Sequence, residues 1–244
     1  TSDLGADVTT TGTQTYTGAA TISADITLTT TSNGSVSFGL TTNGAQTLSI
    51  TTDGTGDVTF TDDVGGSAGL NGLTISTNDF NAVDLKVGGT ISITNTGTSS
   101  EITGVIANDT DAAVLTKAGT GTLTLSNVNN SYTGATTVNN GTLKVTNNNA
   151  LGTNAAGTTV ASGATLDFVN VTYSTTEAIT VDGGTIATST GTSTFAGEIT
   201  LDAHSIFDID GTQLTVSGNV TDGAGTYNIT KTGNGILVLS NTTN

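Results

Sequence analysis

The sequence predicts an all-β protein, a β-solenoid of about 10–12 coils with almost no helix. Three observations support this prediction. About a quarter of the 244 residues are Thr, which is β-branched and favours extended backbone. The 33 Gly and many Asn residues suit tight turns, and no Pro is present to interrupt a strand. Short segments in which apolar and polar residues alternate recur along the whole chain.

These alternating segments are the expected strands, because successive side chains of a strand point to opposite faces. Asn-Gly, Asp-Gly and Gly-Gly pairs, which favour turns, lie between them. No stretch places apolar residues at helical spacing over three turns, so helix is not expected. In chain order the expected strands are residues 24–28, 35–38, 47–50, 57–60, 72–75, 82–87, 90–93, 122–125, 136–138, 142–145, 158–160, 165–168, 178–181, 198–201, 205–209, 213–216 and 236–239.

Three all-β architectures compete for such short strands: a sandwich, a barrel and a solenoid. In a sandwich or barrel, neighbouring strands pair as hairpins, which Asn-Gly turns favour. In a solenoid, each strand pairs with its equivalent one coil later. The solenoid is preferred because the strands are very short and aromatic residues are only 4% of the chain, which indicates a thin core of Leu, Ile and Val. Coils of roughly 20–25 residues would then build a rod about 50 Å long.

The domain organisation follows from the absence of any linker-like stretch. We expect one continuous solenoid segment over residues 1–244, in which residues 1–100 and 101–244 carry repeats of different character. The chain has no initiator Met and no signal peptide, and it stops within a repeat. We therefore expect it to be part of a longer protein, and neither Thr1–Asp7 nor Asn241–Asn244 has the pattern of a cap.

The formal net charge is −16, from 20 acidic residues and four lysines. Because a nucleic-acid-binding surface requires a basic face, nucleic acid is excluded as a partner. The charge also disfavours anionic membrane surfaces, and no apolar run is long enough to cross a membrane as a helix. The simplest explanation of the acidic surface is solubility, since charge keeps β-rich chains from pairing edge to edge. The absence of Cys leaves the redox compartment open.

Two segments of the chain repeat each other. LTKAGTGTLTLSN at Leu115–Asn127 and ITKTGNGILVLSN at Ile229–Asn241 are identical at eight of 13 positions. The shared lysines, Lys117 and Lys231, are two of only four in the chain, so chance matching is a poor explanation. This pair of segments is the clearest internal repeat of the sequence.

Leu115–Gly152 resembles the passenger-associated repeat of bacterial autotransporters, and the segment from Ile229 resembles the start of that repeat. The pattern is Leu-Thr-Lys-x-Gly-x-Gly-Thr-Leu-x-Leu, then a Tyr-Thr-Gly-x-Thr-x-Val turn, then Gly-Thr-Leu. Residues 13–30 and 43–66 look like the repeats of filamentous-haemagglutinin-like β-strand-repeat surface proteins. The residues that match the passenger repeat are Lys117, Gly119, Gly121, Leu123, Leu125, Tyr132, Thr133, Gly134, Thr136, Val138, Gly141, Thr142 and Leu143.

The resemblance implies a right-handed parallel β-helix that is exported to the bacterial cell surface or exterior. The expected function is that of a non-catalytic stalk or adhesive rod in a large surface protein. One alternative is a subunit of a self-assembling extracellular filament or matrix fibre, and a remote one is a polysaccharide-active β-helix enzyme. The expected partners are other copies of the chain, through the terminal coils, or molecules on host or neighbouring cells. No membrane insertion by this segment is expected.

No catalytic, cofactor-binding or metal site is predicted from the residues. His204 is the only histidine, and without Cys or Arg it supports no nucleophilic triad, so we expect an exposed turn residue. Asp208 and Asp210 alternate so as to share a strand face, and Asp62 and Asp63 do so only partly. The chain has no Trp to stack on a sugar and no Arg to bind a substrate carboxylate, which argues against a glycosidase or lyase.

Calcium is the one cofactor left open, because hard oxygen ligands are plentiful. Neither the EF-hand spacing nor the Gly-Gly-x-Gly-x-Asp repeat is present, so solvated turn acids are the preferred interpretation. Thr-x-Thr clusters raise the idea of an ice-binding array. Their irregular spacing favours ordinary outward positions of a ladder. The acidic candidates for calcium are Asp53, Asp57, Asp62, Asp63, Asp109, Asp111, Asp208 and Asp210.

Overall fold

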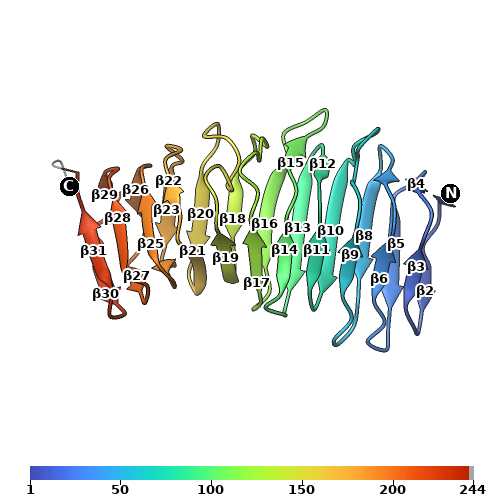
Figure 1. Ribbon diagram of the computed structural model, residues 1–244, viewed down its shortest axis with the longest axis horizontal. Coiled ribbons are helices and arrows are strands. Elements are labelled where there is room, and N and C mark those ends of the chain that lie inside the picture. The colour runs from blue at the N-terminus through green and yellow to red at the C-terminus, as the bar shows by residue number, and fades with distance from the viewer. Residues whose placement is uncertain (242–244) are drawn as a thin grey trace.

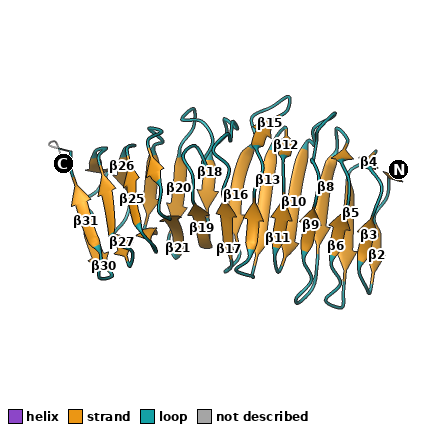
Figure 2. Ribbon diagram, in the orientation of Figure 1, coloured by secondary structure: helices purple, strands orange, loops and turns teal. Residues whose placement is uncertain are grey.

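The computed structural model describes residues 1–241, which form an elongated stack of short strands with β1 near one end and β31 at the other (Figure 1). Within these residues there are 31 strands and no helix, as Figure 2 shows by its colouring. The described part of the chain accordingly contains no helix of the length and apolar character that a membrane crossing needs. The structure is a parallel β-solenoid of about 11 coils, so the predicted fold class is confirmed.

Two long sheets of 11 strands each run the length of the stack, and we name them the first and second sheet. The first sheet contains β2 (Val8–Thr10), β5 (Ile26–Thr30), β8 (Thr47–Thr51), β10 (Gly72–Thr77), β13 (Thr90–Asn95), β16 (Val114–Ala118), β18 (Thr136–Val138), β20 (Thr158–Ala161), β23 (Ile179–Asp182), β26 (Ile199–Leu201) and β29 (Val220–Asp222). The second sheet contains β3 (Gln14–Tyr16), β6 (Val36–Phe38), β9 (Val58–Phe60), β11 (Phe80–Ala82), β14 (Ser100–Ile102), β17 (Thr122–Leu125), β19 (Gly141–Val145), β21 (Ala164–Phe168), β24 (Thr185–Thr188), β27 (Ser205–Ile209) and β30 (Ile229–Thr232).

The third face of the solenoid is built from shorter sheets. Three strands form its first part, two its middle part and four its last part. Val64 bridges Thr42 to Leu85 and so connects the first part to the middle one. The strands are β1 (Ser2–Leu4), β4 (Ala20–Ile22) and β7 (Thr42–Asn43), then β12 (Leu85–Val87) and β15 (Ile106–Asn108), then β22 (Thr172–Tyr173), β25 (Thr192–Phe195), β28 (Gln213–Val216) and β31 (Ile236–Leu239).

All pairings between these strands are parallel, and each strand lies on its equivalent from the preceding coil. Most coils have about the predicted length, up to the 25 positions that separate Leu48 from its partner Leu73. In the first sheet one coil is shorter than predicted, because Leu73 pairs with Ile91, 18 positions on. The coil of 25 takes its extra residues in a loop before β10. The predicted strand 82–87 is wrong, because β11 ends at Ala82 and β12 begins at Leu85, with a corner between them.

The interior is a column of aliphatic side chains under each sheet. In the first sheet, Leu28, Ile50, Ile75 and Ile93 lie in register in four successive coils, and each is at most 1% exposed. Each side chain shields the next, and burial of one such side chain contributes about 1.5–3 kcal/mol. The predicted thin aliphatic core is present, but several inward threonines interrupt it, among them Thr136 and Thr158.

Aromatic rings contribute more to the core than their number suggests. All six phenylalanines are buried, and Tyr16, Phe38 and Phe60 stack on one another in three successive coils of the second sheet. The ring centroids are 4.8 Å apart in both pairs, with interplanar angles of 18° and 9°. The coil repeat of a parallel sheet, about 4.8 Å, therefore sets the stacking distance. The expectation of a purely aliphatic core is corrected by this stack.

Outward Ser and Thr residues form one unbroken column along the first sheet. Their spacing is irregular in the sequence because the coils differ in length. The extra residues lie in loops, so these side chains still align in register. Such a ladder stabilises a sheet by a few tenths to about 1 kcal/mol for each pair. Its members are Thr27, Ser49, Thr74, Ser92, Thr116, Thr137, Thr159, Thr180, Thr200 and Thr221.

Candidate functional site

Six of the aspartates connect one coil to the next through a backbone amide. Asp7 Oδ1 accepts the backbone N–H of Thr27 at 2.7 Å, and Asp84 Oδ1 accepts that of Val105 at 2.6 Å. These carboxylates supply acceptors that the corner amides would otherwise lack. The same arrangement, with Asp or Asn as acceptor, joins Asp25 to Thr47, Asn33 to Thr55, Asn43 to Ser67, Asp57 to Asp79, Asp79 to Ser99, Asn108 to Thr133, Asn148 to Ser174 and Asp167 to Ser189.

The calcium candidates are spread along the stack. Among residues 1–241, no three His, Cys, Asp or Glu side chains are grouped so that they could hold a metal ion. Asp57 accepts the amide of Asp79, and Asp62 accepts that of Asp63 at 2.9 Å. Asp53, Asp111 and Asp210 are exposed, and Asp208 accepts a hydrogen bond from the Thr232 hydroxyl at 2.7 Å. The structure brings no three of the eight together.

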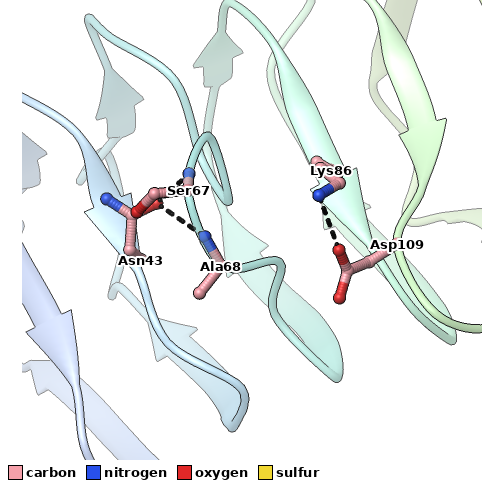
Figure 3. A network of polar contacts seen from close by, with 5 residues as sticks. All are labelled: Asn43, Ser67, Ala68, Lys86 and Asp109. Carbon is pink, nitrogen blue, oxygen red and sulfur yellow. Dashed lines mark hydrogen bonds and ion pairs between the residues drawn. The ribbon is translucent and has the colours of Figure 1, made fainter.

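A groove of about 360 Å³ lies on the third face beside β12, with Asp63, Asp84 and Lys86 in its lining. Partial burial, followed by the charges of Asp84 and Asp62, raises the pKa of Asp63 above its ordinary value. The Lys86 ammonium is 2.7 Å from a carboxylate oxygen of Asp109 in the next coil (Figure 3). The acids of this region thus contact a lysine and backbone amides of adjacent coils.

Figure 3 also shows how an amide side chain holds the long loop of this region. Asn43 Oδ1 accepts the backbone N–H of Ser67 at 2.9 Å and that of Ala68 at 3.4 Å. The loop therefore lies against the preceding coil, although it belongs to the coil with the largest insertion. This insertion lies on the third face, where Val64 and Leu70 bridge to Leu85 and Val87, while the two long sheets stay in register.

His204 lies where the sequence predicts, in an exposed corner between β26 and β27. Its Nδ1 accepts the backbone N–H of Asn228 at 3.0 Å, and its ring meets that of Tyr227 edge to face with centroids 6.0 Å apart. Asp208 and Asp210 lie on and just after β27, which begins one residue after this histidine. The histidine accordingly braces one corner against the next coil.

The repeated lysine occupies an unusual position. Lys117 lies in β16, where it replaces an aliphatic residue in the inward column between Ile93 and Val138. Its side chain is 0% exposed. The ammonium donates to three backbone carbonyls: those of Ala118 at 2.7 Å, Gly119 at 3.0 Å and Asn140 at 3.3 Å. Burial lowers the pKa of Lys117 to about 8. Lys117 thus holds the corner between the first and second sheets from the inside.

The two glycines after Lys117 let this corner approach the preceding coil. Gly119 has φ +73°, and a Cβ there would lie 2.3 Å from the Asn95 carbonyl oxygen. A Cβ on Gly121 would lie 2.1 Å from the Gly97 carbonyl oxygen. Because no side chain fits at either position, the Gly-x-Gly pattern is required by the close stacking of corners.

The second copy builds the same corner on another face. Lys231 Nζ donates to the Gly233 carbonyl at 2.6 Å, just as Lys117 donates to Gly119, and Gly233 has φ +74°. The first copy turns from β16 in the first sheet to β17 in the second. The second copy turns from β30 in the second sheet to β31 on the third face. The motif therefore specifies a local corner, and the path of the coil decides which face carries it.

A pH-dependent contribution to stability follows from Lys117. Since its folded pKa lies below the ordinary 10.5, the unfolded chain binds more protons between pH 8 and 10.5. Relative to Lys117→Met, the wild-type free energy of unfolding should rise by about 2 kcal/mol from pH 7.5 to 10. Urea unfolding of both proteins across this range measures the difference, and parallel pH profiles would contradict it.

The Tyr-Thr-Gly turn contributes a second buried polar group. Tyr132 is 0% exposed, and its hydroxyl is 2.8 Å from that of Thr136, an inward residue of β18. Burial raises the pKa of Tyr132 well above its ordinary value. Nearby, Asn130 accepts the Ile106 amide and donates to the Ala150 carbonyl, at 2.8 Å each. The turn is thus tied to the coils on both sides.

Glu177 is a polar residue that the sequence does not single out. It lies in the corner before β23, is 1% exposed, and accepts a hydrogen bond from the Thr158 hydroxyl at 2.8 Å. Burial raises the pKa of Glu177 to about 7. It lies two residues before Ile179 and four before Val181, so the alternation of β23 continues to an inward position at Glu177. The sequence does not single it out because a carboxylate is not expected at an inward position.

Comparison with known proteins identifies the repeat. The family model described as passenger-associated-transport-repeat matches residues 115–145 and 229–244. The first match spans β16 to β19, including Lys117 and Tyr132, and the second begins at β30. Comparisons with curated proteins and with solved structures gave no significant match. The likeness of residues 13–30 and 43–66 to haemagglutinin-type repeats stays a prediction. The chain therefore carries the passenger-associated transport repeat of autotransporters at two places.

Proposed function

We propose that this chain is a non-catalytic structural segment of a secreted or surface-exposed bacterial protein, a rod that spaces or presents other elements outside the cell. The observation that carries the proposal is the unbroken stack of about 11 parallel coils with a passenger repeat at two places. Each coil contacts its neighbours, so the length of the rod scales with the number of coils. Six of its aspartates accept backbone amides of the next coil, which fits a structural role.

Surface exposure can be tested on intact cells that produce the complete protein. Asp111 and Ala112 are exposed in the loop before β16, so an epitope inserted between them leaves the core untouched. The proposal expects antibody labelling and protease cleavage at this loop without permeabilisation. Labelling that appears only after cell lysis would overturn it. A cytoplasmic protein with the same epitope serves as the lysis control.

The rod should also tolerate loss of a whole coil. Ile199 pairs with Val220 in the next coil, so deletion of residues 199–219 removes one coil and restores the register. We expect a folded protein whose maximum dimension is shorter by about 5 Å. Deletion of residues 199–208, less than half of that coil, should prevent folding of the following segment because its strands would no longer lie opposite their pairing partners in the preceding coil. Small-angle scattering and circular dichroism measure both outcomes.

Self-assembly into a filament is the second candidate function. On β31, in the last described coil, Ile236 and Leu239 are 57% and 39% exposed. A further coil of the same chain or a second copy would cover them. If copies stack end to end, analytical ultracentrifugation of the 244-residue chain should show an average mass that increases with protein concentration. The Ile236→Lys variant should show less association. A monomer at all concentrations would exclude stacking for this chain.

A further inference from the structure

The inward column of the first sheet becomes polar in two successive coils. Leu115 of β16 is followed in register by Thr136 of β18 and Thr158 of β20, and the column returns to Ile179 in β23. Both threonines are 1% exposed. Each hydroxyl bonds to a titratable side chain from the adjacent corner, Thr136 to Tyr132 and Thr158 to Glu177. A buried polar cluster thus replaces aliphatic packing here.

Glu177 is the member of this cluster with the fewest compensating contacts. Oε1 accepts the Thr158 hydroxyl, whereas Oε2 is buried and without a hydrogen-bond partner. The titratable groups that face it are Tyr132 and Tyr173, both buried. Within residues 1–241 the one ion pair joins Lys86, on β12, to Asp109, which follows β15. No cation among these residues therefore neutralises the Glu177 carboxylate. Burial of an ionised carboxylate in such a site costs much more free energy than burial of a neutral carboxyl group.

The turn that carries Glu177 is exposed on its outer side. Residues 174–178 connect β22 to β23, and Ser174, Thr176 and Ala178 are exposed. The turn is held to the preceding coil by amide side chains. Asn148 Oδ1 accepts hydrogen bonds from the backbone amides of Ser174 at 2.8 Å and Thr175 at 3.1 Å. Outward movement of residues 174–177 would bring the carboxyl into water and keep the hydrogen bond from the Thr158 amide to the Ala178 carbonyl, so the strands would stay paired.

We propose that Glu177 is a protonation-controlled latch, which holds the 174–178 turn against the core when neutral and releases it when ionised. Three observations indicate that the closed state favours a neutral Glu177: its carboxyl is buried, Thr158 is its single hydrogen-bond donor, and no cation of the described residues forms an ion pair with it. The open state exchanges the contacts of Asn148, Asn149 and Asn154 with the turn for hydration of the carboxylate. The device lies one coil after the first passenger repeat, so it controls a corner of the rod without breaking the stack.

The direction of the pH response follows from the two states. In the closed state burial raises the pKa of Glu177 to about 7, and in water the ordinary value is 4.5. The closed turn therefore binds more protons than the open one between these values, so its stability is full below pH 4.5 and falls as the pH rises to 7. Between pH 5.5 and 8 the opening equilibrium should rise about 30-fold.

Carboxyl carbon NMR of the whole chain tests the closed state directly, because Glu101, Glu177 and Glu198 are the only glutamates. One of three resonances is expected to titrate near pH 7 and to disappear in Glu177→Gln. In the matched control Glu198→Gln, which changes an exposed glutamate, it should remain. Thr158→Val removes the sole hydrogen-bond donor and should raise the midpoint further. If all three glutamates titrate in the ordinary range, the proposal is overturned.

Amide exchange tests the opening. After correction for the intrinsic dependence on pH, exchange at Ser174 and Thr175 should accelerate about 30-fold from pH 5.5 to 8 in the wild-type chain. In Glu177→Gln it should stay constant, and in Glu198→Gln it should follow the wild type. Exchange that is equally slow at both pH values in the wild type, or an unchanged response in Glu177→Gln, would refute the latch. Neither result bears on surface exposure, which is measured separately on cells.

Discussion

Replacement of Phe38 by Ala is expected to lower the free energy of unfolding by about 4 kcal/mol, the range for loss of a fully buried ring. Phe38 is 0% exposed and lies between Tyr16 and Phe60, 4.8 Å from each ring centroid. Its removal leaves a cavity in the middle of the stack and deprives both neighbours of a partner. Because each coil contacts only adjacent coils, the damage should concentrate around β6.

Urea unfolding measures the loss of stability, and hydrogen exchange at β3, β6 and β9 locates it. Phe38→Leu keeps most of the volume and should cost considerably less. Val128→Ala is a suitable surface control, since Val128 is 46% exposed, and should change stability by less than about 0.5 kcal/mol. A Phe38→Ala protein within about 1 kcal/mol of wild type would show that the stacked ring contributes little to stability, and would contradict the prediction.

Gly121→Ala is expected to cost about 3 kcal/mol, because the added Cβ has no room. It would lie 2.1 Å from the carbonyl oxygen of Gly97, a backbone atom of the preceding coil. The Gly121 amide also donates to the Asn95 carbonyl at 2.9 Å, so the corner cannot move away without losing this bond. The expected defect is a local separation of two coils at the corner of the passenger repeat.

Two other glycines distinguish steric clash of the added Cβ from strain of the backbone as the cause of this loss of stability. A Cβ on Gly12 would meet open space, and the φ of this residue is not positive, so Gly12→Ala should be nearly neutral. Gly163 also has open space but φ +81°, so Gly163→Ala should cost about 1–2 kcal/mol from backbone conformation alone. Thermal melts of the three variants should rank Gly121→Ala lowest. Equal melting temperatures for Gly121→Ala and Gly12→Ala would contradict the close approach of the corners.

Much of the fold follows from residue patterns that act locally. Alternation in segments such as Thr122–Leu125 predicts which side chains point inward, because the period of two is a property of extended backbone. The Lys117 motif predicts a particular corner for the same reason, since its glycines are required by backbone geometry that both copies share. The parallel stack and the absence of helix were also predictable, from the brevity of the strands and the composition.

Residue patterns are thus sufficient for the local geometry of this chain: its strands, its turns and the repeated corner. The register between coils of unequal length emerges only in the folded stack, because loop insertions carry no alternation to reveal it. That register places Phe38 between two rings, puts Lys117 in an aliphatic column and sets Glu177 against Thr158 of the preceding coil. Burial and pKa depend on which coil lies above and below, and this is a property of the assembled stack.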